Sequence, residues 1–406
     1  MPEAVIVSAT RSPIGRAFKG SLKDVRPDDL ATDVVRALLD KTPQVDPKDI
    51  EDLLMGCGLP GGEQGFNIGR VVAVQLGYDH LPGTTITRYC SSSLQTTRMA
   101  AHAIRAGEGD IYISAGVETV SRYIKGNSDM IPDTENPKFA DAKARTEATK
   151  ASEGSSWSDP REDGQLPDVY IAMGETAENL ARLKGISRQD QDEFAVSSQN
   201  RAEKAIANGF FEREITPITT PDGTVVSTDD GPRAGVTLEG VSGLKPVFRS
   251  DGTVTAGNAC PLNDGASAVL VMSDTKAKEL GLTPLARIVS TAVTGLSPEI
   301  MGYGPYEAIK VALKRAGKEV SDIDVFEINE AFAAQVVPSA RDLGIDFDKL
   351  NPFGGAIALG HPFGSTGARI TGTLINGLQT LDGQFGVESM CVGGGMGMAM
   401  VIERLS

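Results

Sequence analysis

Short apolar runs alternate with longer segments of helical spacing along this chain, and the alternation occurs twice. The runs are rich in Val, Ile and Ala, which is typical of buried strands. Three pairs of segments match between the first and last parts of the chain: 4–9 with 286–291, 45–56 with 320–328, and 111–116 with 389–394. Strands that alternate with helices form βαβ units. The pattern therefore predicts an α/β fold of two duplicated halves, each with a mostly parallel sheet.

A long excursion separates the two halves. Residues 121–172 are rich in Ser, Asp, Lys, Pro and Gly, and they predict a long surface segment. Residues 187–208 begin with a capping box and predict a helix, whereas 217–250 predict turns and short strands. The strand 266–272 then closes the first half. The expected domains are a first half, a loop domain and a second half, at 1–120 plus 251–275, 121–250, and 276–406.

Composition and charge exclude several classes of protein. The 406 residues carry a formal net charge of −15, which argues against binding to nucleic acid or to anionic lipid. A polyanionic small substrate would therefore need a local basic patch. No apolar run reaches the length of a membrane span, and the first residues lack the features of a signal peptide. We expect a cytoplasmic enzyme rather than a membrane protein.

Cysteine and histidine are too few and too scattered for a disulfide framework or a metal site. No two cysteines form a C-x-x-C pair, and no histidine has ligand spacing. The residues concerned are Cys57, Cys90, Cys260 and Cys391, with His80, His102 and His361. We expect no metal.

Cys90 is the first candidate for chemistry. The extended segment 84–89 precedes it, and residues 91–104 continue with helical spacing to a stop at Gly107. A cysteine at a helix N-terminus has its thiolate favoured by the helix dipole and by free N–H groups. The alternative is that Cys90 is a small buried apolar residue and that Ser91–Ser93 form a capping cluster.

The second half carries polar residues at matching turns. Asn329 ends a buried strand, where it could also be a helix cap. His361 stands between Gly360 and Pro362 at a helix start, opposite Cys90 by the repeat. Cys391 precedes a glycine run that could merely allow tight packing, and no Lys-Ser or Lys-Thr follows to make a phosphate loop. Two cysteines, one histidine and one asparagine on matched turns form a more specific pattern than any member alone.

These residues lie in runs that resemble the signature blocks of the thiolase family. The runs are 90–95, 329–332, 360–362 and 391–395, with 255–258 and 262–266 adding to the likeness. The resemblance covers essentially the whole chain, in order. It implies a thiolase-like fold: two duplicated βαβ-rich halves in five layers, with an inserted loop domain.

The resemblance also implies a reaction and roles. Cys90 would take the acyl group, His361 would activate it, and Cys391 would be the acid and base at the acetyl-CoA carbon. Asn329 would hold a water that forms one oxyanion hole with His361, and the N–H groups of Cys90 and Gly393 would form the other. The reaction implied is CoA-dependent cleavage of a 3-ketoacyl-CoA, or condensation of two acetyl-CoA, through an acyl-Cys90 with ping-pong kinetics. No cofactor is implied, because coenzyme A is a substrate.

The same resemblance suggests substrate contacts and an assembly. Arg233 and Cys260 would contact CoA, although Cys260 stands where relatives usually have Ser, and Gly240 where some have a second Ser. Met173 and Met301 match residues of the acyl pocket, with ordinary core packing as the alternative. The expected partners are CoA and acyl-CoA, and the expected assembly is a homodimer or homotetramer.

Two other functions stay open on the same fold. A 3-ketoacyl synthase would normally need a second active-site histidine or a His/Asn pair, whereas Cys391 occupies that turn. A non-catalytic acyl-CoA or sterol carrier usually lacks one catalytic residue, whereas all four are present here. The runs 244–248 and 327–329 resemble degradative 3-ketoacyl-CoA thiolases more than acetoacetyl-CoA thiolases.

Overall fold

A ten-stranded mixed sheet forms the frame of the molecule. The computed structural model describes residues 2–125 and 134–406. Its strands follow the order β10-β11-β12-β9-β1-β8-β5-β3-β4, with β2 paired to β8, and β6 and β7 form a separate hairpin. The strands are β1 (Ala4–Arg11), β2 (Gly15–Arg16), β3 (Asp52–Gly56), β4 (Gly83–Ile86), β5 (Ile111–Thr119), β6 (Ile218–Thr219), β7 (Val225–Val226), β8 (Asn263–Ser273), β9 (Ala286–Gly295), β10 (Val325–Ile328), β11 (Phe385–Val392) and β12 (Met396–Arg404).

Twelve α-helices are present among the described residues. They are α1 (Pro27–Asp40), α2 (Ile68–Gln75), α3 (Ser92–Ala106), α4 (Ala140–Ala151), α5 (Met173–Leu183), α6 (Arg188–Ala207), α7 (Leu238–Ser242), α8 (Asp274–Glu279), α9 (Gly304–Ala316), α10 (Ala333–Leu343), α11 (Ala356–Leu359) and α12 (Thr366–Leu381). Short 3-10 turns that bear on the site include η3 (Tyr89–Ser91), η7 (Pro298–Tyr303) and η9 (Phe363–Ser365).

The strand order confirms the predicted duplication. The series β9-β12-β11-β10 repeats the series β1-β8-β5-β3, and the halves meet where Val5 and Ile6 of β1 pair with Arg287 and Ala286 of β9. The expectation of a mostly parallel sheet is wrong. Among the described strands, β3 is parallel to β4 and β5, and β10 to β11, while the remaining pairs are antiparallel. The last strand of each half pairs antiparallel with the first strand of that half: β8 pairs with β1, and β12 pairs with β9.

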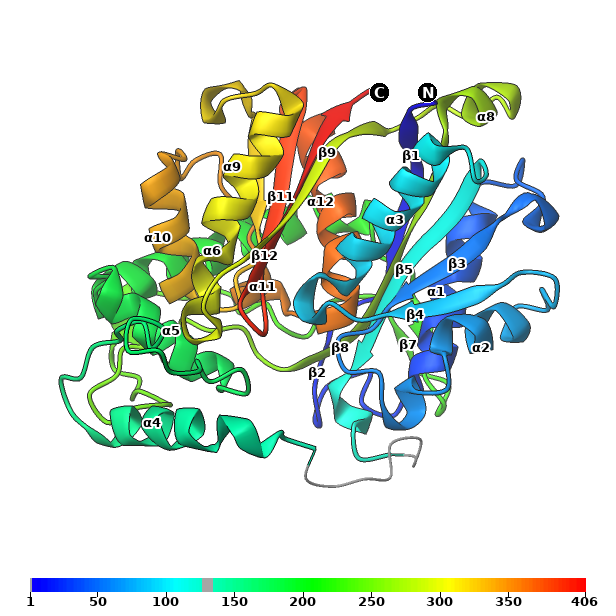
Figure 1. Cartoon of the computed structure of the whole chain (residues 1–406). Helices are drawn as coiled ribbons and strands as arrows, with labels where there is room; N and C mark the ends of the chain where they lie inside the picture. Colours follow the sequence, from blue (N-terminus) through cyan, green and yellow to red (C-terminus); the bar gives the residue numbers. More distant parts are fainter. Residues whose placement is uncertain (1, 126–133) are drawn as a thin grey trace.

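The elements stack in five layers, which Figure 1 shows from right to left. Helices α1 and α2 cover the outer face of the first sheet half, and α9 and α10 cover the outer face of the second. Helices α3 and α12 lie between the two sheet halves and fill the central core. Both faces of the sheet are therefore covered, which explains why all the residues of β8 are buried.

The excursion is more helical than predicted. Helices α5 and α6 pack against the second half through Ala177, Ala181 and Phe194. The expectation of a surface segment over 121–172 misses α4, which lies along the edge of the molecule in Figure 1 and buries only Ala142. Its Ala, Lys, Glu and Arg residues favour helix without forming an apolar face. Residues 126–133 of that segment lie outside the described residues. The predicted domain boundaries stay a prediction.

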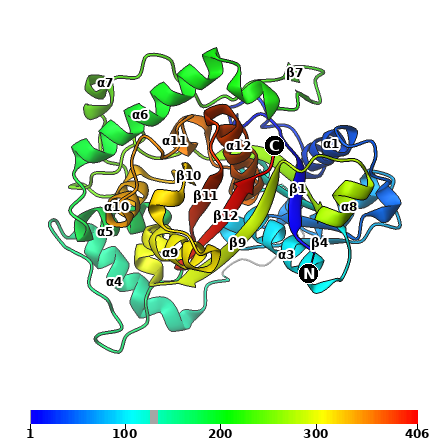
Figure 2. The same ribbon diagram turned by 90° about the horizontal axis from the view of Figure 1, so that it is seen from above.

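The N-terminal turns of α3 and α12 touch at the centre of the molecule. An ideal Cβ at Gly367, in the first turn of α12, would lie 2.2 Å from the backbone N of Leu94 in α3. An ideal Cβ at Gly364 would lie 2.5 Å from the carbonyl oxygen of Val117 and 2.7 Å from the Cα of Cys57. Figure 2 shows the two helices in the same central layer from above. Glycine is required at these positions, because backbone stands where a side chain would be.

Replacing Gly367 by alanine should destabilise the fold. The added methyl would force two backbones apart, at a cost of about 1–3 kcal/mol in the free energy of unfolding. Gly372→Ala on the same helix is the matched control, because its Cβ would meet Ala9 at an ordinary 3.5 Å. That change should alter stability by less than about 1 kcal/mol. Denaturant unfolding would measure both, and equal destabilisation would contradict this view of the centre.

Candidate active site

Cys90 lies on the 3-10 turn η3, between the end of β4 and the start of α3. Tyr89, just before it, has φ of +43°, which is rare for a bulky residue. Its ring packs on the backbone of the second half, because an ideal Cβ at Gly393 would lie 3.3 Å from it. Strain of this kind persists where surrounding structure enforces it, often at functional sites. The turn thus holds Cys90 against the loop that follows Cys391.

The serine run beside Cys90 makes structural hydrogen bonds. Ser91 Oγ donates to the carbonyl of Arg88 at 3.1 Å, and Ser92 Oγ donates to the carbonyl of Tyr89 at 2.6 Å. Ser93 Oγ accepts from the backbone N–H of Ala368 in α12 at 2.9 Å, which ties the two central helices together. The capping alternative is wrong for these serines, because Ser91 is the N-cap of α3 but makes no side-chain cap hydrogen bond.

Cys90 lies at a strand-to-helix turn, as predicted, but burial outweighs the effect of the backbone N–H groups on its thiolate. Helix α3 begins two residues later, and Cys90 is buried. Burial raises the pKa of the Cys90 thiol to about 12, although the backbone N–H groups of Gly393 and of Cys90 itself act in the opposite direction. Cys90 is consequently a neutral thiol at physiological pH.

His361 is a buried base that carries no positive charge at neutral pH. The imidazole is 1% exposed, and burial, with Arg369 nearby, lowers its pKa to about 3. Its Nδ1 lies 2.7 Å from Thr366 Oγ1, which itself donates to the carbonyl of Pro362. A hydroxyl has one proton to give, so Nδ1 must be the donor to Thr366. The Nε2 atom therefore carries the acceptor lone pair of the ring and is the basic nitrogen.

Asn329 faces the basic nitrogen of His361. Its Nδ2 lies 3.2 Å from His361 Nε2, and its backbone N–H donates to the carbonyl of Ser389 at 2.9 Å. The helix-cap alternative is wrong, because the N-cap of α10 is Phe332. The Oδ1 atom of Asn329 is buried without a hydrogen-bond partner. A buried amide oxygen normally has a partner, so this atom fits a water or a substrate group.

Cys391 is the next-to-last residue of β11 and is buried. Its Sγ donates to Oε1 of Gln335 at 3.3 Å, and Gln335 Nε2 lies 3.4 Å from the sulfur of Met301. Burial raises the pKa of the Cys391 thiol well above its ordinary value, and the thiols of Cys90 and Cys260 add to the rise. Sequence reasoning missed Gln335, whose only signal is a polar residue within the apolar start of α10.

Glu118 is a second residue that sequence reasoning missed. This fully buried carboxylate accepts from the backbone N–H groups of Gly58 at 2.7 Å and Gly364 at 2.8 Å, and from Tyr123 Oη at 2.9 Å. Burial raises its pKa, and these donors act in the opposite direction. Glu118 thereby joins a loop of the first half to the loop that follows His361.

A cavity of about 580 Å³ lies beside these residues, and Cys260 lines it. Arg233 and Gly240 line it as well, together with Arg16 and Lys19, which the sequence did not single out. None of these three cations forms an ion pair with another described residue. In a chain of net charge −15, three unpaired cations at one cavity form a local basic patch.

The remaining expected residues divide between site and core. Met301 contacts Gln335 and is buried, and Met173 begins α5 at the edge of the same apolar cluster. No group of three His, Cys, Asp or Glu side chains suited to a metal ion occurs in the described chain. Within residues 2–125 and 134–406, every helix is too short or too polar to traverse a lipid bilayer.

The arrangement defines a class of enzyme. A buried thiol and a neutral imidazole precede the two central helices α3 and α12, and a second buried thiol lies at the end of β11. A thiol nucleophile with a histidine base forms thioesters, and a second thiol can move a proton at carbon. The fold and the site are suited to an acyltransferase.

Comparison with known proteins agrees with this class. The family model for the thiolase N-terminal domain matches residues 4–275, and that for the thiolase C-terminal domain matches residues 282–404. The chain belongs to the thiolase family. The predicted family, fold and enzyme class are confirmed, as is the type of reaction, CoA-dependent thiolytic cleavage or the reverse condensation.

Similar proteins cover the whole chain. A 3-ketoacyl-CoA thiolase of Bacillus subtilis (strain 168) is 44% identical over 99% of this chain and 100% of its own length. A beta-ketoadipyl-CoA thiolase of Acinetobacter baylyi is 42% identical over 100% of both. The Bacillus anthracis acetyl-CoA acetyltransferase structure has a TM-score of 0.85 and 39% identity, covering 100% of this chain and 99% of that one. The dimeric peroxisomal thiolase of Saccharomyces cerevisiae has a TM-score of 0.88 and 38% identity, covering 99% of this chain and 97% of that one.

The rate at which acetyl-CoA acylates Cys90 should be flat with pH through the neutral range. His361 is a neutral base above its pKa of about 3, and the Cys90 thiol keeps its proton up to a pKa of about 12. Neither population changes between about pH 5.5 and about pH 9. Quenched-flow mass spectrometry would measure the rate. An inflection near the ordinary histidine pKa of about 6.5 would contradict the assignment.

His361→Asn is the control for this profile. Without the imidazole, the thiol proton must pass to solvent before attack. Acylation should then be slow and should rise about tenfold per pH unit, as the thiolate fraction does.

Proposed function

We propose that this protein cleaves 3-ketoacyl-CoA with CoA, or condenses two acetyl-CoA, through an acyl group on Cys90. The observation that carries the proposal is the buried group of Cys90, His361 and Cys391 beside a basic cavity. The first step transfers the Cys90 proton to His361 Nε2 as sulfur attacks the 3-keto carbon. The bond between C2 and C3 then breaks, and the Cys391 thiol gives its proton to C2, which releases acetyl-CoA.

The second half of the cycle returns every proton. The Cys391 thiolate takes the proton of the incoming CoA thiol, and the CoA sulfur attacks the acyl-Cys90 thioester. Cys90 leaves as a thiolate and recovers its proton from His361. The two products leave in separate steps, so ping-pong kinetics are expected.

Two oxyanion holes fit the groups around Cys90. The N–H groups of Cys90 and Gly393, which oppose the rise in the pKa of the thiol, would stabilise one developing oxyanion. A water on Asn329, together with His361, would stabilise the other, and the unpartnered Oδ1 of Asn329 supports a water there. Two holes are needed because the ketone and the thioester each develop negative charge on oxygen.

Coenzyme A fits the basic cavity. Arg233, Arg16 and Lys19 offer three unpaired cations to its phosphates, and Cys260 lies at the end nearer the catalytic thiols. Met301 and Met173 would line the acyl group, since Met301 touches Gln335 next to Cys391. The relatives are named for both 3-ketoacyl and beta-ketoadipyl substrates, so the preferred length of the acyl chain has to be measured. A cytoplasmic location stays a prediction.

Variants of the two cysteines should separate their roles. Cys391→Ser should form an acyl-enzyme with acetyl-CoA yet turn over very slowly, because attack needs only Cys90 and His361. Cys90→Ser should form little or none, and Cys90→Ala should lose both thiolysis and condensation while staying folded. Intact-protein mass spectrometry and steady-state rates would measure this. Equal acylation of Cys391→Ser and Cys90→Ser would contradict the division of roles.

We further propose a homodimer or a dimer of dimers that pairs through the β4 edge of the sheet. Strand β4 lies at the end of the strand order and, within the described chain, pairs with β3 alone. Asn67 binds it, donating to the Gly83 carbonyl at 2.8 Å, and the neighbouring Phe66 is 77% exposed. An exposed edge beside an exposed aromatic side chain is suited to pairing with another chain. The yeast relative is described as dimeric.

Phe66→Asp should convert the oligomer to a 42.7 kDa monomer at micromolar concentration. A carboxylate cannot be buried in an apolar interface without a partner. Light scattering would measure the mass. The control is Leu381→Asp, since Leu381 is exposed but lies at the end of α12, away from β4. A wild-type protein that is itself monomeric would contradict the proposal.

A further inference from the structure

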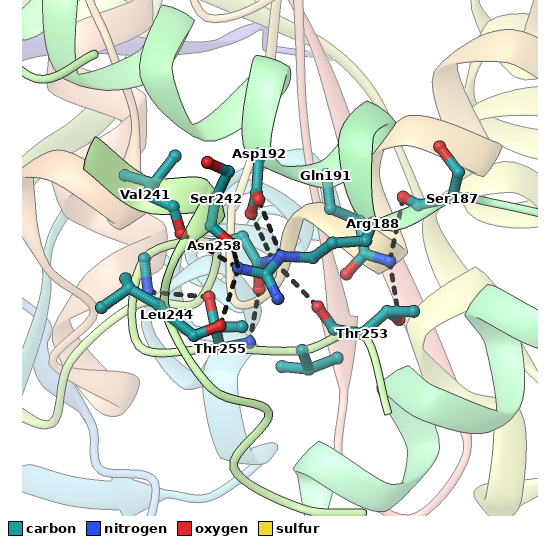
Figure 3. Close-up of polar contacts among 12 residues, drawn as sticks. Ser187, Arg188, Gln191, Asp192, Val241, Ser242, Leu244, Thr253, Thr255 and Asn258 are labelled. Carbon is teal, nitrogen blue, oxygen red and sulfur yellow. Dashed lines mark hydrogen bonds and ion pairs between the residues drawn. The ribbon is translucent and has the colours of Figure 1, made fainter. Parts of the chain in front are cut away.

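Arg188, the first residue of α6, binds the end of the short helix α7. Its Nη2 donates to the backbone carbonyls of Val241 at 2.9 Å, Leu244 at 3.0 Å and Ser242 at 3.2 Å. Figure 3 shows the guanidinium pointing from α6 toward these carbonyls. Carbonyls at a helix C-terminus have no partner within the helix, so a cation there stabilises it.

The other side of the guanidinium is fixed by a buried acid. Arg188 Nε donates to Asp192 Oδ2 at 2.7 Å, and Asp192 Oδ1 accepts from Asn258 Nδ2 at 2.8 Å. Asn258 Oδ1 in turn accepts from the backbone N–H of Thr255 at 2.8 Å. Asp192 is 1% exposed, so the arginine is held in one orientation by an interaction that water does not screen. Figure 3 shows this series of contacts from α6 to the loop after Thr253.

Helix α7 and the loop after Thr253 are two walls of the basic cavity. Thr237, Val241 and Leu244 line it from the α7 side, and Gly257 lines it from the loop side. Leu244 packs directly on Gly257, since an ideal Cβ there would lie 2.7 Å from its side chain. Of the five residues of α7, only Val241 is buried, so α7 has little core of its own to fix its position. Arg188 binds the α7 wall directly and is joined to the loop wall through Asp192 and Asn258.

We infer that Arg188 is a positioning residue for the pantetheine arm of the CoA thioester. It touches neither the catalytic thiols nor the cavity, and it sets the distance between α7 and the loop that bears Cys260. Its loss should weaken binding of substrates that extend along these walls and should leave the chemistry at Cys90 intact. The inference rests on the proposed binding of CoA in this cavity.

The test compares acylation of Cys90 by a full and by a truncated donor. Acetyl-CoA spans the cavity, whereas acetyl-N-acetylcysteamine carries the same thioester without the nucleotide and most of the pantetheine. In Arg188→Met, the acetyl-CoA concentration for half-maximal acylation should rise about tenfold, the loss expected for a charge-assisted hydrogen bond. The maximal rate should not change, and acylation by acetyl-N-acetylcysteamine should match the wild type.

Arg188→Lys is the second variant, and it keeps the test interpretable if Arg188→Met does not fold. Lysine keeps a cation near Asp192 but lacks the guanidinium fork that reaches the three carbonyls. It should fold, as checked by thermal unfolding, and should show the same selective loss at smaller size.

Arg201 supplies a matched control on the same helix. Its guanidinium also donates to backbone carbonyls, those of Phe347 and Leu350, and its side chain is 26% exposed against 25% for Arg188. These carbonyls do not line the basic cavity. Arg201→Met should therefore leave the ratio of the two acylation reactions unchanged, whatever it does to stability.

A loss confined to acetyl-CoA in the Arg188 variants supports the inference. Equal losses with both donors, no loss with either, or the same selective loss in Arg201→Met would overturn it. A wild-type protein that neither donor acylates would refute the proposed function itself, which is a different result from a normally acylated Arg188→Met.

Discussion

The structure depends on one close contact, the approach of the first turns of α3 and α12 at the centre of five layers. Gly367 allows the backbone of α12 to reach Leu94, and Gly364 allows the preceding turn η9 to reach Cys57 and Val117. These contacts bring two turns that are far apart in sequence into one buried volume. Cys90 lies on one turn and His361 on the other, and both are excluded from water.

Exclusion of water sets the protonation states. Burial raises the pKa of the Cys90 thiol and lowers that of the His361 imidazole, so both groups are neutral at rest. A buried ion pair would carry a large desolvation cost that a neutral pair avoids. Charge arises only when sulfur attacks, and the N–H groups around the turn are already in place to stabilise it. The cations of the basic cavity, by contrast, lie toward the surface, where they can bind phosphate groups.

Matched turns could be predicted from sequence because each half repeats the same order of strand, turn and helix. Cys90, Asn329 and Cys391 end or follow strands, whereas His361 lies between α11 and η9. The structure places Asn329 against His361, and Cys90 close enough to Cys391 to raise its pKa. The antiparallel direction of β8 and β12 could not be predicted from the sequence, because an apolar run indicates that a strand is buried but not which way it runs. Glu118 could not be predicted because its role comes from contacts across the halves, and Gln335 could not because its contacts join three separate elements of the second half. The neutral state of the Cys90 thiol could not be predicted either, because it results from burial, which overrides the local effect of a helix end.

The central claim, a neutral His361 with its proton on Nδ1, can be tested by ¹⁵N NMR of the imidazole side chains. The chain has only three histidines, so a His361→Asn variant assigns the signals. The account predicts that, at neutral pH, Nδ1 of His361 carries the proton and Nε2 is unprotonated. An imidazolium with protons on both nitrogens, or a neutral ring with its proton on Nε2, would contradict it.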